Sequence, residues 1–215
     1  MKATYIGYSF AMAIATTTAS KACAPFPSSM DIFTSGFEEP VPPFVKSSYN
    51  TSFLQHKWCA LPALHTNANL SHITSGYIYN LPDQNQVIAN EAYDGNLAAS
   101  TFNYANISQD GLVDNTVVYI PIDGNDTSPE SYRGYVNPGF PLIKDDFLVS
   151  NGAVFGGLVK RELLPHQVAS WSIMYQNAIP VTVYVDNCNV VVGYDFYSPY
   201  ERTYVITMYF NTQTA

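Results

Sequence analysis

The feature that most constrains this chain is a series of short apolar runs, each ended by turn-forming residues. Residues 73–79 alternate, with Tyr77 and Tyr79 on one side and Ile78 on the other. Similar runs occupy residues 86–93, 97–104, 116–122, 180–186, 190–196 and 203–210. Period-two alternation broken by pairs such as Asp94-Gly95 is typical of antiparallel strands joined by tight turns. The pattern predicts a mainly β domain.

One stretch fits a helix better than a strand. Leu164, Val168, Trp171 and Tyr175 recur at intervals of 4, 3 and 4 residues, and Pro165 suits a first helical turn. The spacing predicts a short helix that carries Trp171 on its apolar face. Residues 128–157 are rich in Pro and Gly, and we expect them to be irregular.

The N-terminus has the layout of a secretory signal peptide. Lys2 precedes an uncharged, mostly apolar run over residues 5–15, and small residues follow up to Ala19. Cleavage after Ala19 fits this pattern, so residues 1–19 are interpreted as a signal peptide of a secreted protein. A buried N-terminal helix is the alternative. No later run approaches the roughly 20 apolar residues of a membrane span, which predicts no integral membrane segment.

The remaining chain divides into a lead-in and one domain. Residues 20–46 are rich in proline and are interpreted as an extended lead-in, and residues 47–215 as a single β-rich domain. Four N-x-Ser/Thr acceptors predict surface N-glycans in an exported chain: Asn50, Asn69, Asn106 and Asn125.

The chain contains three cysteines, and the predicted export determines whether they are expected to form a disulfide. In an oxidising compartment an even number is expected to pair. Cys23 lies beside the predicted cleavage site, so the sequence favours a disulfide between Cys59 and Cys188. Two free buried thiols are the alternative.

Charge and motif content exclude several function classes. The formal net charge is −8 with no Lys/Arg run, which argues against nucleic acid as a partner. The spacing of His56, His65 and His72 matches no compact metal site, and no cofactor motif is present. Carboxylate pairs such as Glu91–Asp94 and Asp145–Asp146 cannot be ranked by spacing alone, so no catalytic residue is assigned and enzyme activity stays open.

Two segments carry a resemblance to a known superfamily. The strand 76–80, a turn and the strand 86–90 resemble the opening hairpin of ependymin-related and lipoprotein-carrier-like (LolA-like) proteins. Trp171 followed by 179–181 and 193–196 is similar to their closing segment. Asn80 stands where that family has Asp, and ependymins carry more paired cysteines. Over about residues 76–210, the resemblance implies a curved antiparallel sheet or half-barrel with one or two short helices across its concave face, gripping a hydrophobic ligand.

These observations favour a secreted glycoprotein that binds a lipid or another hydrophobic small molecule in a curved-sheet pocket. Aromatic residues are plentiful, with 17 Tyr and 12 Phe. The predicted pocket residues are Tyr77, Tyr79, Phe102, Tyr119, Trp171, Tyr184, Tyr194, Phe196 and Tyr209. An extracellular surface, matrix or carbohydrate-binding protein with outward-facing rings is the second hypothesis, and a secreted hydrolase the third. A homodimer stays open.

Overall fold

A single antiparallel sheet of eleven strands dominates the computed structural model, which describes residues 23–59, 71–93, 95–122, 128–198 and 202–214. The strands are β1 (Tyr49–Cys59), β2 (Ser71–Leu81), β3 (Gln86–Tyr93), β4 (Asn96–Ile107), β5 (Val113–Pro121), β6 (Glu130–Val136), β7 (Val154–Lys160), β8 (Gln167–Tyr175), β9 (Ile179–Val185), β10 (Val191–Ser198) and β11 (Thr203–Thr214). The described helices are the short η1 (Ser28–Met30), η3 (Pro82–Gln84) and α1 (Phe147–Ser150).

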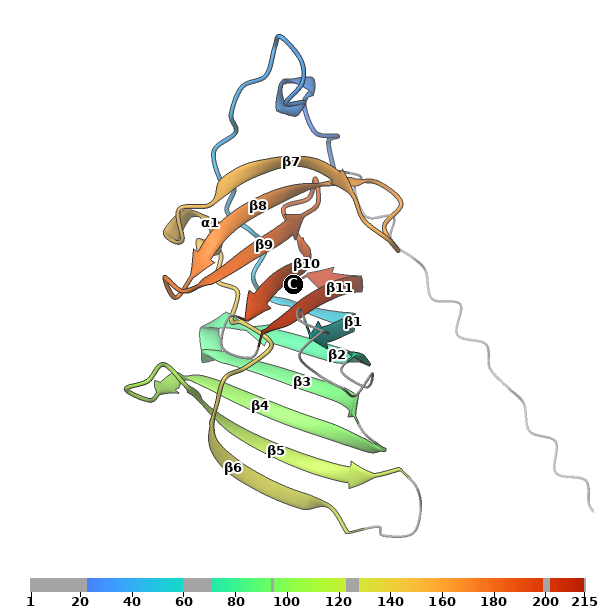
Figure 1. Cartoon of the computed structure of the whole chain (residues 1–215), viewed down its shortest axis with the longest axis vertical. Coiled ribbons are helices and arrows are strands. Elements are labelled where there is room, and N and C mark those ends of the chain that lie inside the picture. The colour runs from blue at the N-terminus through green and yellow to red at the C-terminus, as the bar shows by residue number, and fades with distance from the viewer. Residues whose placement is uncertain (1–22, 60–70, 94, 123–127, 199–201, 215) are drawn as a thin grey trace, which may run out of the picture.

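The sheet consists of two meanders joined at their inner strands. Strands β1 to β6 run in sequence toward one edge, and β7 to β11 run from the other edge back to the middle, where β11 pairs with β1 (Figure 1). In this central pairing Phe53 lies opposite Tyr209. The sheet curves but does not close, which confirms the predicted mainly β, curved antiparallel fold.

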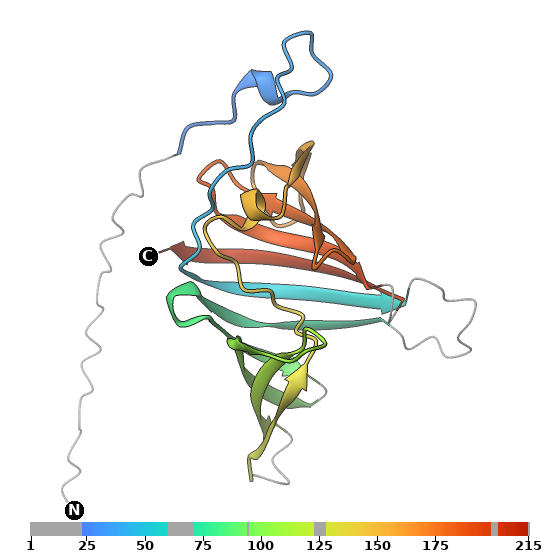
Figure 2. The same ribbon diagram turned by 90° about the vertical axis from the view of Figure 1, so that its left-hand side faces the viewer.

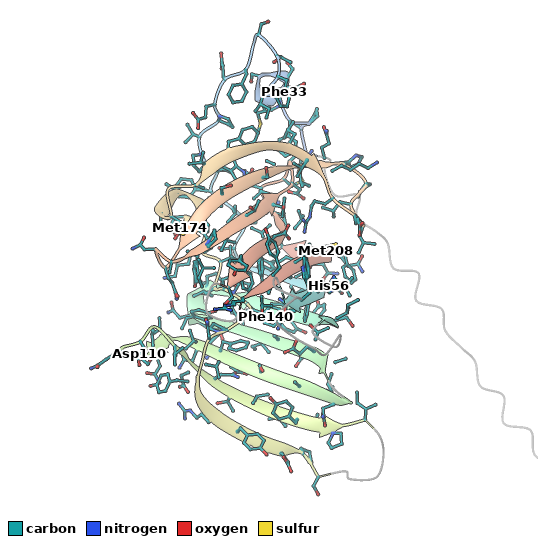
Figure 3. The ribbon with its side chains drawn as sticks, in the orientation of Figure 1. Phe33, His56, Asp110, Phe140, Met174 and Met208 are labelled. Atoms are coloured by element: carbon teal, nitrogen blue, oxygen red, sulfur yellow. A yellow bond between two sulfur atoms is a disulfide. The ribbon has the colours of Figure 1, made fainter. Side chains whose placement is uncertain are left out.

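The inner, concave face of the sheet carries the core. Residues 137–153, here named the crossing segment, leave β6 at one edge and pass over this face to β7 at the other (Figure 2). The crossing segment contains α1 and buries Phe140 and Leu148 against the strands, with Phe140 over the middle of the sheet (Figure 3). Alternation along β1 turns Phe53, which is 0% exposed, toward this segment. The helix in this segment is the four-residue α1, which does not coincide with the helix predicted over residues 164–175.

Trp171 lies on a strand, so the prediction of a helix over Leu164–Tyr175 is wrong. Trp171 pairs with Val183 of β9 in the β8–β9 ladder. Its separation of four residues from Tyr175 is even and therefore suits one face of a strand as well as one face of a helix. The interval 128–157, expected to be irregular, also contains strand β6 and the start of strand β7.

The disulfide joins Cys23 to Cys188, so the predicted pairing of Cys59 with Cys188 is wrong. Cys59 lies opposite Thr203 on β11, which in turn lies opposite Ser198 at the end of β10. Cys188 precedes the start of β10. The two backbone positions are thus more than about 20 Å apart along the strand direction, whereas a disulfide needs Cα atoms within about 7 Å.

The lead-in packs against the sheet at both of its ends. Met30 and Val45 are buried in the core, and Asn187 donates hydrogen bonds to the carbonyls of Cys23 and Ala24 beside the disulfide. Between these anchors the chain projects from the β7 side, and Phe33, 92% exposed, lies near its tip (Figure 3).

The predicted signal peptide and the acceptors Asn69 and Asn125 lie outside the described residues. Within the described part of the chain, no helix has the length and apolar character needed to cross a bilayer.

Candidate functional site

The crossing segment is fastened to the inner face by side chains from distant strands. Tyr194 of β10 donates a hydrogen bond of 2.6 Å to the carbonyl of Gly139. Tyr104 of β4 donates one of 2.5 Å to the next carbonyl, that of Phe140. Because Tyr104 and Tyr194 belong to different meanders, these bonds hold the segment across the junction of the two halves of the sheet.

A cavity of about 160 Å³ lies between the crossing segment and strands β1 and β8 to β11. Its lining combines Pro138, Gly139, Pro141, Ile143 and Phe147 of the crossing segment with Tyr175, Ile179, Val181, Val183, Tyr194, Phe196 and Val205 of the sheet. The inner wall is deeply buried, since Val183 and Ile143 are each 1% exposed. The site is therefore an apolar cavity roofed by a fastened segment of chain.

The lining also includes two packed rings and a few polar groups. The ring of Phe147 in α1 packs against that of Tyr175, with centroids 6.1 Å apart. Asn137, Ser198 and Lys57 supply the polar part of the lining. Among the described lining residues, Lys57 carries the one charged side chain. Most of the cavity wall can thus make only dispersion contacts with a ligand, whereas Lys57 provides a charged hydrogen-bond donor.

The tyrosines around the cavity stay neutral at physiological pH. Burial raises the pKa of Tyr175 above its ordinary value of 10.0, and it raises that of Tyr194 far more. A neutral phenol keeps its hydroxyl hydrogen, which Tyr194 uses to hold Gly139. These rings therefore add apolar surface and hydrogen-bond donors to the cavity wall without adding negative charge.

The structure brings two of the nine predicted pocket residues, Tyr194 and Phe196, into this cavity. Phe102 and Tyr209 are buried elsewhere on the inner face. Trp171 is also buried there, and it lines a separate cavity of about 240 Å³ under the lead-in.

The other four predicted pocket residues lie away from the cavity. Tyr77 and Tyr79 alternate with the buried Ile78 and so face the outer side of β2. On the outer side of β9, Tyr184 donates a hydrogen bond to Asp195, while Arg161 lies 3.9 Å above its ring and pairs with the same carboxylate. Tyr119 packs edge-on against Tyr132 near the β6 edge.

Sequence reasoning did not identify Lys57, Gly139 or Phe147 as site residues. Lys57 lies on β1, a strand whose inner face mixes Phe53 with the polar Gln55 and so has no clean apolar alternation. Gly139 and Phe147 belong to the stretch expected to be irregular. The signal that could have found them is the Pro and Gly content of residues 137–153, because this composition is typical of chain that does not join a sheet.

A row of rings crosses the outer face near one end of the central strands. Trp58 stacks on Tyr204 with centroids 5.4 Å apart, and Tyr204 contacts Tyr197 at 5.9 Å. These residues come from β1, β11 and β10 and lie opposite one another in the ladders. Tyr204 is 43% exposed, so the row is accessible to a partner.

Other residues singled out by sequence are dispersed. Asn50 accepts a hydrogen bond from Tyr77, and Asn106 donates one to Asp114. Asp145 and its neighbour Asp146 lie on the crossing segment, outside the described lining of the cavity. In the described ranges no group of three His, Cys, Asp or Glu side chains is placed to hold a metal ion.

Comparisons with solved structures give distant likenesses, of which two are a DUF1329 family protein and a LolA superfamily protein. No protein-family model matches the chain, and no curated protein matches it in sequence. A DUF1329 family protein from Desulfovibrio piger is similar at a TM-score of 0.36 and 7% identity, over 79% of this chain and 86% of that one. A LolA superfamily protein from Nitrosomonas europaea is similar at a TM-score of 0.29 and 7% identity, over 80% and 88%. The candidate site therefore rests on the geometry of this chain itself.

Proposed function

We propose that this protein binds an apolar small molecule, or the apolar part of a lipid, in the cavity beneath the crossing segment. The observation that carries the proposal is the lining, in which apolar side chains from β9, β10, β11 and the crossing segment enclose one space. Ligand sites are usually concave and mostly apolar, with a few polar groups that fix orientation.

The volume of the cavity limits the size of the ligand that it can enclose. A volume of about 160 Å³ is close to the roughly 150 Å³ of an apolar cavity that accepts benzene. The site therefore suits a single ring or a short alkyl chain, and we expect a longer lipid to extend out past Asn137, an exposed residue of the lining. The described lining includes no Asp or Glu, and binding rather than hydrolysis is the activity that this composition supports.

Calorimetric titration with 1-octanol tests the proposal. We expect saturable binding with a negative heat-capacity change, because apolar surface leaves water. Val183→Phe, which places a ring in the cavity, should abolish binding, whereas Val117→Phe on β5 should leave it intact. Absence of heat with the unmodified protein, or equal binding by both variants, would contradict the proposed site.

Secretion and N-glycosylation belong to the same proposal. A signal peptide ending at Ala19 leaves Cys23 in the mature chain, where it can pair with Cys188. We expect the secreted protein to begin between residues 20 and 23, and enzymatic glycan removal to lower its mass. An N-terminus at Met1, or a mass unchanged by deglycosylation, would refute these two statements.

Carbohydrate binding at the outer ring row is a second candidate function. The exposed Tyr204, flanked by Trp58 and Tyr197, is the observation that favours it. Tyr204→Ala should then remove binding to immobilised polysaccharide, with Tyr132→Ala on β6 as the control. If both variants bind as the unmodified protein does, the ring row has no such role.

A further inference from the structure

We propose that the polar side of the cavity binds a carboxylate, so that the preferred ligands are acids with a short apolar body. This inference rests on the proposed function and specifies its ligand class. It derives from three residues that meet under the crossing segment: Gly139, Gln55 and Lys57.

The missing side chain at Gly139 leaves space above two polar groups. A Cβ placed on Gly139 would lie 3.8 Å from Oε1 of Gln55, 3.9 Å from its Nε2 and 3.9 Å from Nζ of Lys57. These are the three nearest heavy atoms to that point, and Gly139 lines the cavity. A ligand head group at this position would therefore touch an amide and an ammonium together.

Gln55 has hydrogen-bonding capacity that the described protein atoms do not use. Its side chain is fully buried, its Nε2 donates a 2.9 Å bond to the hydroxyl of Thr207, and its Oε1 has no partner among the described residues. A buried polar atom without a partner costs about 1–3 kcal/mol. If the side-chain amide of Gln55 rotates by 180°, Oε1 accepts a hydrogen bond from the hydroxyl of Thr207, and Nε2 becomes free to donate a hydrogen bond to a carboxylate.

Lys57 supplies the positive charge. Its side chain is on the inner face, opposite Val205 of β11, and lines the cavity. In the described chain no carboxylate lies within 4.0 Å of its ammonium, although the charges of Lys57 and Glu91 act on each other over a longer distance. The ammonium is therefore available to a closer anion.

Together these groups define a recognition pattern. The ammonium of Lys57 and one N–H of Gln55 match the two oxygens of a carboxylate, and bonds to charged groups are stronger than neutral ones. The apolar body then extends along Val205 and Phe196 into the cavity. An amine of the same length would face Lys57 with like charge, so the site selects acids over alcohols and alcohols over amines.

Calorimetry with octanoate, 1-octanol and octylammonium tests this inference on the full mature protein. We expect octanoate to bind roughly tenfold more tightly than octanol, as one charge-assisted bond allows, and octylammonium to bind least. Lys57→Met should lower octanoate affinity far more than octanol affinity, and so remove the preference for octanoate. Lys160→Met on β7 removes the same charge at a distance and should keep the preference.

Gly139→Ala gives an independent check, because its new methyl group fills the head-group position at ordinary contact distance. It should weaken octanoate more than octanol. Equal affinity for octanoate and octanol in the unmodified protein would overturn the carboxylate inference and leave the proposed function standing. Failure of all three ligands to bind would instead remove the proposed function itself.

Discussion

Asn80 and Ile143 exchange two hydrogen bonds across the inner face of the sheet. Nδ2 of Asn80 donates to the carbonyl of Ile143 at 2.6 Å, and the backbone N–H of Ile143 donates to Oδ1 of Asn80 at 3.1 Å. The same Nδ2 also donates to the carbonyl of Ser47. One buried side chain on β2 thereby holds both the crossing segment, at the cavity-lining Ile143, and Ser47, the residue that follows the lead-in.

Replacing Asn80 by Ala should destabilise the protein strongly. The change leaves the peptide groups of Ile143 and Ser47 without their partner, at an expected cost of about 2–4 kcal/mol in the free energy of unfolding. Urea unfolding monitored by circular dichroism measures it. Asn103→Ala, which removes one bond at an exposed site, should cost far less, and equal losses would argue against the role given to Asn80.

Two phenylalanines on the inner face should respond differently to truncation. Phe53 is fully buried, so Phe53→Ala should cost about 3–5 kcal/mol of stability. Phe196 is half-buried and lines the cavity, so Phe196→Ala should cost less, about 1–3 kcal/mol. It should also weaken octanol binding roughly tenfold. A Phe196→Ala variant that loses stability but keeps its affinity would place the ligand elsewhere.

The disulfide should hold the lead-in to the β9–β10 turn. Cys23 and Cys188 are separated by 165 residues, and the chain-entropy model gives a stabilisation of up to about 5 kcal/mol for such a loop. Cys23→Ser and Cys188→Ser should therefore lower stability equally, with no further loss in the double variant. Non-reducing peptide mapping should return the Cys23–Cys188 peptide, and Cys59→Ser should leave it in place. A Cys59–Cys188 peptide would contradict the structure.

The sequence predicted the sheet better than it predicted the cavity. The runs at 73–79 and 203–210 became β2 and β11 because their alternation matches a half-buried strand. β6 was not predicted because nearly all of its residues are exposed, so its sequence lacks the alternation of apolar and polar residues that marks a half-buried strand. The cavity could not be predicted, since its roof and floor, such as Gly139 and Tyr194, are 55 residues apart in the chain and meet only in the folded molecule.

Asp114 should make stability sensitive to acid. Arg133, assisted by Asn106, holds the pKa of Asp114 at about 2, below its ordinary 3.8. A depressed pKa in the folded state stabilises the protein above pH 3.8, and this contribution is lost as the pH falls toward 2. Asp114→Asn should therefore flatten the dependence of the unfolding free energy on pH between about 4 and 2. Denaturant titrations at several pH values measure this slope.

Glu91 should give the opposite dependence. Burial raises the pKa of this carboxyl above its ordinary 4.5, and the charge of Lys57 opposes the shift only in part. The folded protein thus holds the proton of Glu91 more tightly than the unfolded chain does, so its stability falls as the pH rises through this raised pKa.

Glu91→Gln removes the cost of a buried charge, and it should stabilise the protein at pH 7 while leaving stability near pH 4 almost unchanged. Asp83→Asn, at an exposed position in η3, serves as the control for the removal of one negative charge. The neutral amide of the Glu91→Gln variant does not attract the ammonium of Lys57 as the carboxylate does. This variant should therefore also bind octanoate more tightly than the unmodified protein at pH 7. The opposite result would be a Glu91→Gln substitution that lowers the free energy of unfolding at pH 7 more than at pH 4. It would mean that the folded protein stabilises the ionised carboxylate, and it would contradict this account.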